Sequence, residues 1–417
     1  MKIVSSLFSR LLRRERKLVF VVLVGIALRY AYVFCCIDIS KDFYWEYGEI
    51  AKNLHAGKGY SLFYLNRTES AFMFNEASAP CPSAFMPPGY VMFLWPFLNI
   101  TDVPLRNVLI LSVQIVAAAL VLVLLYLFTE RFVRQGAGLF AAGIAAVLPE
   151  FVYSTSSYTP TVFFHLGIMG LLSLLHSGNQ LRAPRTIVLV GFVSVVLLYL
   201  RSEVVLFVAA SVFLVGRVAG ARAGIMVAGL VVLLHLPWEI RNYTVFGEWV
   251  PLTTSGGMNF FRGHNEEGST AWSDEAIGRQ AARLPFDRHY EVEMNNLFFQ
   301  GSFQYIRDHT LQDFVHAGQK LLRFWIITPE DRRSGAALYV VPWLILLTLG
   351  IVGMVRLRAW ASHRPEWIFL LCYTIVAVSF FVLPRYQTMM KVAIIPFAGS
   401  AVFSLLPAEW RRHFTDR

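Results

Sequence analysis

Long runs of apolar residues, separated by short polar or basic stretches, dominate the chain. The longer runs match the roughly 20 residues that a helix needs to cross a bilayer, and the shorter ones are expected to tilt or share boundaries. The pattern predicts an all-α polytopic membrane protein with roughly ten transmembrane helices, treated as one domain over 1–417. The apolar runs lie at about 18–37, 104–128, 137–152, 160–176, 186–200, 203–216, 222–237, 337–355, 366–383 and 389–406.

The composition excludes an ordinary soluble protein. Of the 417 residues, 56% are hydrophobic and only 15% are charged, and the mean hydropathy is +0.54. The net charge of +10 could indicate nucleic-acid binding, but the basic residues lie in short clusters between apolar runs instead of on one face or tail. We therefore expect membrane lipids around the chain and no nucleic-acid partner.

The basic clusters predict which side of the membrane each loop faces. If the basic N-terminus is cytoplasmic, the loops that must also be cytoplasmic are the basic ones, as the positive-inside rule requires. Both termini are then cytoplasmic, and two long segments, 38–104 and 238–335, lie outside. The arginines of the cytoplasmic loops are Arg131, Arg134, Arg182, Arg185, Arg217, Arg222, Arg356, Arg358, Arg364, Arg411 and Arg412.

The first outer segment contains two candidate juxtamembrane helices. Over 42–53, Asp42, Glu46 and Glu49 recur at helical spacing, so one face carries three carboxylates. Such a face at a membrane surface can bind a metal, repel anions or take a proton from a substrate. The apolar stretch 87–98 is too short to span and begins with proline, which predicts a re-entrant or interfacial helix.

Cysteine and histidine positions do not predict a metal site. The four cysteines form no CxxC or Cys/His ligand spacing. A disulfide between Cys81 and Cys35 or Cys36 is left open, because all three fall on the same predicted side. His165, His176 and His235 lie in or beside spans without partners at ligand spacing, so interior packing is expected for each. 

Four stretches, taken in order, resemble a known superfamily. They are EYGEIAKNLHAGKGYS after Asp42, MPPGYVMFL, LPWEIRNYTVFGEWVPLTTSGGMNFFRGHN at 236–265, and PRYQTMMKVAIIPF at 384–397. The chain resembles the polyprenyl-phosphate-dependent glycosyltransferases of the C-type superfamily. The closest likeness is to bacterial members of glycosyltransferase family 39, relatives of protein O-mannosyltransferases and of the lipid A aminoarabinose transferase. 

The resemblance implies the C-type glycosyltransferase fold in a bacterial inner membrane. It implies an inverting hexosyl or pentosyl transfer from a polyprenyl-phosphate-linked sugar to a glycan, lipid or protein acceptor outside the cytoplasm. An acidic residue of the first outer segment acts as general base in this family, and Asp42 matches that position best. The spacing from Asp42 to Ala51 is one residue longer than the usual pattern, so Asp38 and Glu46 stay alternatives, with Glu46 the named fallback.

The chemistry of the donor points to cations as well. A polyprenyl phosphate leaves as an anion, so the reaction needs one base for the acceptor and cations for the phosphate. Arg385 and Lys391, with Tyr386, flank the outer start of the last span, at headgroup height. Arg201 is a further candidate for contact with the donor phosphate, although it can instead pair with Glu203. No metal ligands are required, so we expect turnover without a metal or other cofactor.

The second outer segment, 238–335, is the probable acceptor region. Arg241 and Asn242 follow a tryptophan at a span end, where they contact the donor or acceptor or simply anchor the helix. His264 lies in a polar loop and is a candidate for acceptor contact. Two alternative functions are left open: a polysaccharide ligase or polymerase with a diphosphate-linked donor, which would not need Asp42, and a lipid-linked-sugar transporter or flippase.

Overall fold

The computed structural model describes residues 16–41, 44–62, 80–265, 279–281, 284–285, 287–326, 336–358 and 362–415. Most of these residues are helical. The strands among them are β1 (Ser61–Leu62) and β2 (Cys81–Pro82), which pair antiparallel with Ser61 opposite Pro82. The described part of the chain is thus an α-helical bundle, as the sequence predicts.

Every predicted apolar run corresponds to a helix or a helix pair. Six of the described helices are long and apolar enough to cross a membrane by themselves, or up to seven if one bent pair counts as a span. α8 and α9 are apolar but shorter, so the total of ten spans stays a prediction. The helices are α2 (Arg16–Cys36), α5 (Val103–Phe128), α6 (Gly138–Val147), α7 (Pro149–Thr155), α8 (Thr161–Leu175), α9 (Pro184–Leu200), α10 (Val205–Ala219), α11 (Ala221–Phe246), α16 (Ala337–Arg356), α17 (Arg364–Ser379) and α18 (Pro384–Leu405).

The bent pair, α6 and α7, explains a buried arginine in an otherwise apolar helix. The two helices meet at 64°, at Pro149, which has no N–H to continue the helical hydrogen bonds. Arg29 of α2 is 2% exposed. It donates to the carbonyls of Ala145 and Ala146 at 3.3 and 3.2 Å and to the hydroxyl of Thr155 at 3.2 Å. The guanidinium therefore satisfies carbonyls that the break leaves without helical partners.

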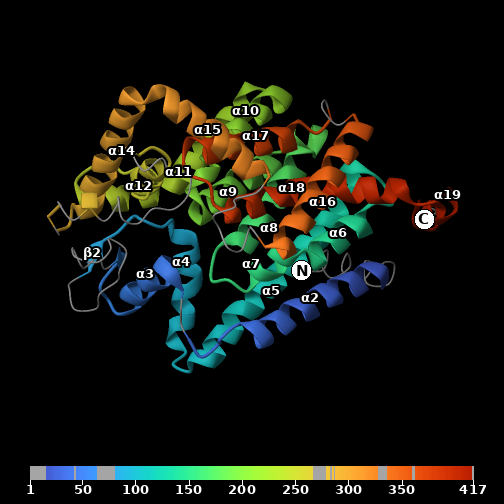
Figure 1. Cartoon of the computed structure of the whole chain (residues 1–417), viewed down its shortest axis with the longest axis horizontal. Coiled ribbons are helices and arrows are strands. Elements are labelled where there is room, and N and C mark those ends of the chain that lie inside the picture. Colours follow the sequence, from blue (N-terminus) through green and yellow to red (C-terminus); the bar gives the residue numbers. More distant parts are fainter. Residues whose placement is uncertain are drawn as a thin grey trace.

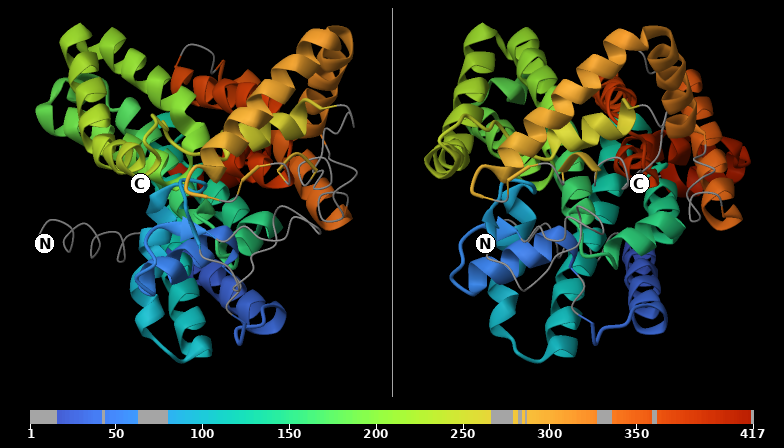
Figure 2. Two further views of the ribbon diagram at one scale, coloured as in Figure 1. Left: turned by 90° about the vertical axis from the view of Figure 1, so that its left-hand side faces the viewer. Right: turned by 60° about the vertical axis from the view of Figure 1, so that its left-hand side comes forward.

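The elements that connect the long helices at one end form a cap. They gather on the left of Figure 1, whereas α19 (Ala408–Thr415) lies on the right. Figure 2 shows α14 and α15 meeting in a sharp bend. The cap consists of α3 (Trp45–His55), β1, β2, α4 (Pro88–Leu94), η1 (Trp95–Asn99), α12 (Gly256–Gly263), α14 (Tyr290–Asp308) and α15 (Thr310–Trp325).

The opposite end, which we call the basic end, carries the arginine clusters of the short loops. Lys17, at the start of α2, lies over the Phe414 ring of α19 with its Nζ 4.5 Å from the ring centroid. The first and last described helices therefore meet at this end. Arg134, in the loop before α6, lies close enough to Arg356 of α16 and Arg411 of α19 for their charges to interact.

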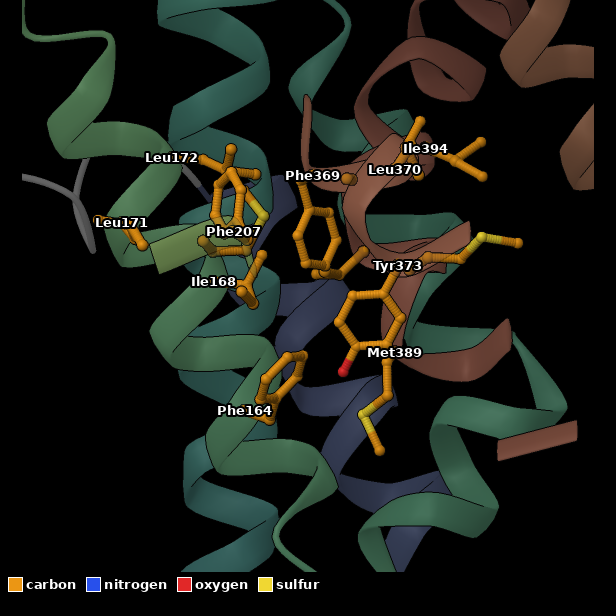
Figure 3. Packing of buried hydrophobic residues seen from close by; sticks show 14 of the residues in the cluster. Phe164, Ile168, Leu171, Leu172, Phe207, Phe369, Leu370, Tyr373, Met389 and Ile394 are labelled. Carbon is orange, nitrogen blue, oxygen red and sulfur yellow. The ribbon is translucent and has the colours of Figure 1, made fainter. Parts of the chain in front are cut away.

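α18 forms the centre of the bundle. In its most apolar stretch 83% of the residues are buried, against 22% for α2. Figure 3 shows aromatic and aliphatic side chains of α8, α10, α17 and α18 packed together, with Phe207 beside Phe369 and Tyr373 beside Phe164 and Met389. A charged residue placed on α18 is consequently surrounded by protein, and its partner must come from a neighbouring helix.

The predicted short helix at 87–98 is present as α4 followed by η1. Proline occupies its first turn, as expected for a helix start. A Cβ at Gly89 would lie 2.6 Å from the Tyr199 carbonyl oxygen, so glycine is what allows α4 to pack against the end of α9. The next residue, Tyr90, is buried and donates to Gln114 of α5 at 2.6 Å.

The disulfide left open by the sequence does not form. All four cysteines are free thiols, with Cys35 and Cys36 exposed and Cys81 buried. The Cys81 thiol instead donates to the Asp287 carbonyl at 3.2 Å, which fastens β2 to the segment before α14. 

Candidate active site at the cap end

Asp42 lies outside the described residues, but the residues on both sides of it are held by one side chain. The Asn107 amide of α5 donates to the carbonyls of Ile39 and Lys41 at 2.8 and 3.0 Å. The hydroxyl of Tyr44 donates to the same amide's oxygen. Arg106, next to Asn107, donates to Tyr44 Oη at 3.0 Å. The chain before and after position 42 is thus fastened to the cap end of α5.

The helix predicted at 42–53 is observed as α3, over Trp45–His55, and it begins with strained backbone. Trp45 has φ 55°, a left-handed conformation that bulky residues rarely adopt. Tyr44 packs tightly over Gly48, where a Cβ would lie 1.9 Å from that of Tyr44. Strain of this kind concentrates at functional sites, and here it lies within three residues of Asp42.

The other carboxylates of this segment differ in their partners. Glu46 is half-buried on α3, whereas Glu49 pairs with Lys52 at 3.1 Å. Asp38 is exposed and accepts from the Ser40 hydroxyl and pairs with Lys41. The hydrogen bond from the Ser40 hydroxyl, with further bonds from Lys41 and the Ser40 amide, lowers the pKa of Asp38 to about 2. A carboxylate of such low basicity is a weak proton acceptor.

Tyr47 marks where α3 meets the rest of the site. Its side chain is buried, and burial raises its pKa to about 12. The charges that act on its hydroxyl include those of Arg201, Glu203 and Arg385. The Tyr47 hydroxyl of α3 is therefore within electrostatic range of the turn between α9 and α10 and of the start of α18.

Three of the four residues predicted to contact the phosphate of the sugar donor, Arg201, Arg385 and Tyr386, come together in the structure. The guanidinium carbons of Arg201 and Arg385 lie 5.8 and 5.9 Å from the centroid of the Tyr386 ring. Both are within the range of a cation–π contact. Arg201 also pairs with Glu203 of η4 (Ser202–Val204), the ion pair that the sequence left as an alternative. Arg385 is exposed, so its guanidinium is accessible to a ligand.

Lys391, the fourth predicted donor residue, already has an anionic partner. It is fully buried in α18 and pairs with Glu150 of α7. Its Nζ also lies 4.4 Å from the Trp343 ring centroid. Glu150, which no sequence pattern indicated, explains how an ammonium is tolerated at this depth. A phosphate contact by Lys391 stays a prediction and would require its ammonium to be shared with Glu150.

Arg241 and Asn242 bond to the cap's own backbone. Arg241 donates to the carbonyls of Ser83 and Tyr60 at 2.6 and 2.8 Å. The Asn242 amide donates to the Val250 carbonyl at 3.2 Å. These two residues of α11 therefore fasten both outer segments to the bundle. Their proposed contact with donor or acceptor stays a prediction.

Glu291 of α14, which the sequence analysis missed, links the two outer segments. One of its carboxylate oxygens accepts from the Ala84 amide at 2.9 Å and from the Thr254 hydroxyl at 2.6 Å. Burial raises the pKa of Glu291. No local pattern distinguishes this glutamate from others in the outer segment, because both partners lie far from it in the sequence.

His264 lies in a buried polar cluster instead of an open loop. Its Nδ1 is 2.5 Å from Asp313 Oδ1 and its Nε2 is 2.9 Å from the Ser379 carbonyl. Burial, and then the charge of Lys320, lower the pKa of His264. Lys320 is itself buried, donates to two main-chain carbonyls, and has its pKa lowered by burial to about 8. No sequence pattern indicated Asp313 or Lys320 as a partner of His264.

The comparisons with known proteins establish the fold. No protein-family model and no curated protein matches the sequence. A tethered oligosaccharyltransferase–acceptor peptide structure from Archaeoglobus fulgidus is similar at 13% identity and a TM-score of 0.56, over 94% of this chain and 49% of that chain. Archaeal oligosaccharyltransferase AglB from the same organism, in complex with an inhibitory peptide and a dolichol-phosphate, is similar at 11% identity and a TM-score of 0.50. This likeness covers 94% of this chain and 50% of that chain.

ArnT from Cupriavidus metallidurans, bound to undecaprenyl phosphate, is similar at 12% identity and a TM-score of 0.42, over 93% of this chain and 78% of that one. The fold assignment rests on the two oligosaccharyltransferase structures. This chain spans about half the length of each, and the likeness extends through nearly all of its own residues.

Proposed function

We propose that this chain, which has the fold of the C-type glycosyltransferases, moves a sugar from a polyprenyl-phosphate-linked donor to an acceptor outside the cytoplasm. One observation carries the proposal: Arg201 and Arg385 flank Tyr386 at the cap end of α18, and their charges act on Tyr47 of α3. A guanidinium at the end of a membrane helix suits a lipid phosphate, because it can donate two hydrogen bonds to phosphate oxygens while the lipid chain stays in the bilayer. Arg385 is exposed, whereas Arg201 would have to share its guanidinium with Glu203.

The chain is a multi-pass membrane protein, and we place its cap on the outer side of a bacterial inner membrane. The support is the set of arginines at the other end. Helix α15 supports a position of the cap at the membrane surface, because it buries Lys320 but exposes Leu311 and Phe314 by 79% and 76%. An amphipathic helix with large apolar side chains on its exposed face suits a membrane surface.

The ligands of the similar structures agree with this donor class. One oligosaccharyltransferase structure holds a dolichol-phosphate and another a tethered acceptor peptide. For the present chain we propose a monophosphate-linked hexose or pentose as donor and a hydroxyl of a glycan, lipid or protein as acceptor. The second outer segment, 238–335, would meet the acceptor.

We assign the general base to Asp42, with Glu46 one turn along α3 as the fallback. The base takes the acceptor hydroxyl's proton as its oxygen attacks the sugar's anomeric carbon. The bond from that carbon to the phosphate oxygen breaks, and its electron pair leaves with the phosphate, which Arg385 and Arg201 stabilise. Attack opposite the leaving group inverts the anomeric configuration. The low pKa of Asp38 makes its carboxylate a poor base for this step.

No step is assigned to a metal. At the cap end, the described residues do not bring three histidine or carboxylate ligands together. Turnover is expected to continue in the presence of EDTA.

Sugar release from defined donors tests the function. Purified protein in lipid nanodiscs is given a polyprenyl-monophosphate sugar or the diphosphate-linked equivalent, and lipid products are measured by mass spectrometry. We expect the wild type to consume the monophosphate donor and Arg385→Ala to lose this activity. The control Arg307→Ala changes an exposed arginine of the cap and should consume the donor as the wild type does. Consumption of the diphosphate donor alone would favour the ligase or polymerase. Movement of intact donor between vesicle leaflets would favour the transporter.

A further inference from the structure

Three potential metal ligands meet at the basic end, far along the chain from one another. His176 is the C-cap of α8, His363 is the N-cap of α17, and Glu366 lies in the first turn of α17. The Nε2 of His176 is 2.9 and 3.0 Å from the two carboxylate oxygens of Glu366. The Nδ1 of His363 is 3.3 Å from one of those oxygens. Two imidazoles are thus directed at one carboxylate.

The cluster is enclosed by protein. Glu366 is fully buried, His363 is 4% exposed, and the His176 side chain is 12% exposed. Phe132 of η2 (Thr129–Val133) stacks on the His176 ring with centroids 5.2 Å apart, and Phe397 of α18 contacts the His363 ring at 5.1 Å. Apolar walls around a polar centre are common at metal sites, where they limit the access of water.

The distances suit a tetrahedral ion. Metal–ligand bonds of about 2.0–2.1 Å place neighbouring ligand atoms roughly 3.3 Å apart. The contacts of Glu366 with His176 and His363 are 2.9–3.3 Å. All three ligand atoms lie within 4.8 Å of one another, so the two imidazole nitrogens need to approach each other by at most about 1.5 Å to reach the separation expected around one ion.

We propose that His176, His363 and Glu366 form a site for a divalent transition metal, with Zn²⁺ the best match. Two imidazoles and a carboxylate are typical zinc ligands, and the partly exposed side of His176 leaves a fourth position for water. The ion would fasten the end of α8 to the start of α17, 190 residues apart. It would be structural and lies at the opposite end of the bundle from the proposed active site.

A purely ionic cluster is the competing explanation. One protonated histidine would balance the Glu366 carboxylate, and the second histidine would then be an ordinary hydrogen-bond partner. The two explanations differ in measurable ways. A metal site binds zinc with a fixed stoichiometry, and bound zinc stabilises the folded chain by mass action.

Metal content distinguishes the two explanations without using enzymatic activity. Protein carrying a tag without histidines is stripped with a chelator, dialysed against Zn²⁺, and measured by inductively coupled plasma mass spectrometry. We expect one zinc per chain in the wild type and near zero in His363→Ala and His176→Gln. The control His309→Ala changes an exposed cap histidine and should keep the zinc.

His176→Gln guards against misfolding, because the glutamine amide can still donate to Glu366 while no longer serving as a zinc ligand. Added zinc should raise the thermal unfolding midpoint of the wild type and of His309→Ala but not that of His176→Gln. Equal zinc content in wild type and His176→Gln, or no zinc-dependent rise in the wild type, would overturn the proposal and leave the ionic cluster.

Discussion

Two sets of polar contacts, one at the cap end and one at the basic end, fasten the chain in different ways. At the cap, Arg241, Asn242 and Asn107 donate mainly to main-chain carbonyls of the outer segments. At the basic end, the His176–Glu366 contact joins side chains of two helices. The difference indicates which cap residues are candidates for contact with the substrate. A side chain whose N–H groups bond to main-chain carbonyls holds the cap in place. An exposed side chain such as Arg385 is accessible to a ligand.

The largest effect is expected from the proposed base. Asp42→Asn keeps the shape and removes the basicity, so turnover should fall by about 10²–10⁴ while donor affinity stays nearly unchanged. Single-turnover sugar transfer and donor binding, measured on the same sample, check this. Asp308→Asn, a change at an exposed acidic residue of α14, is the matched control.

The companion variant Glu46→Gln decides whether Asp42 or Glu46 is the general base. An inactive Glu46→Gln beside a nearly wild-type Asp42→Asn would move the base to Glu46. Activity in both would refute a single carboxylate base on this segment.

Two cap arginines test the division between positioning and binding. Arg385→Ala should weaken donor binding by about 1.5–3 kcal/mol, the value of a charge-assisted hydrogen bond, with little change in unfolding temperature. Arg385→Lys should lose less, because it keeps the charge. Isothermal titration with the lipid-phosphate sugar and thermal denaturation give the two readouts.

Arg241→Ala should show the reverse. Its bonds to Ser83 and Tyr60 hold the first outer segment, so the variant should unfold at a lower temperature. A variant that keeps wild-type stability yet loses donor affinity would place Arg241 among the binding residues.

A smaller, pH-dependent effect is expected from Lys320. Burial lowers its pKa from 10.5 to about 8, so between those values the unfolded chain binds more protons than the folded one. Stability relative to Lys320→Met should therefore rise with pH across this window, by at most about 1.4 kcal/mol per pH unit. Denaturant unfolding of both proteins at pH 7.5, 9 and 10 checks the sign. A flat difference would indicate that Lys320 stays charged.

The sidedness of the two ends can be tested without changing either site. A cysteine at position 309, in a background that lacks the four native cysteines, should react with an impermeant maleimide from outside the cell. Arg356→Cys, at the basic end, should react only after the membrane is opened. The opposite pattern would invert the proposed topology. Neither change should alter stability, because both positions are exposed.

The sequence anticipated the helices and part of the site. Arg201, Arg385 and Tyr386 were named from the chain and come together in the structure. Glu150 was not named, because an acid inside an apolar run has no local signature that identifies Lys391 as its partner. The role of Asp42 stays a prediction.

What the sequence by itself determined is local: the ten apolar runs became helices because burial of continuous apolar surface needs no distant partner to be recognised. The tertiary structure alone decided which polar groups meet. Arg29 bonds to a carbonyl 117 residues away, and His176 to a carboxylate 190 residues away. A buried polar group must be paired somewhere, but only the packing of the helices determines where that partner is.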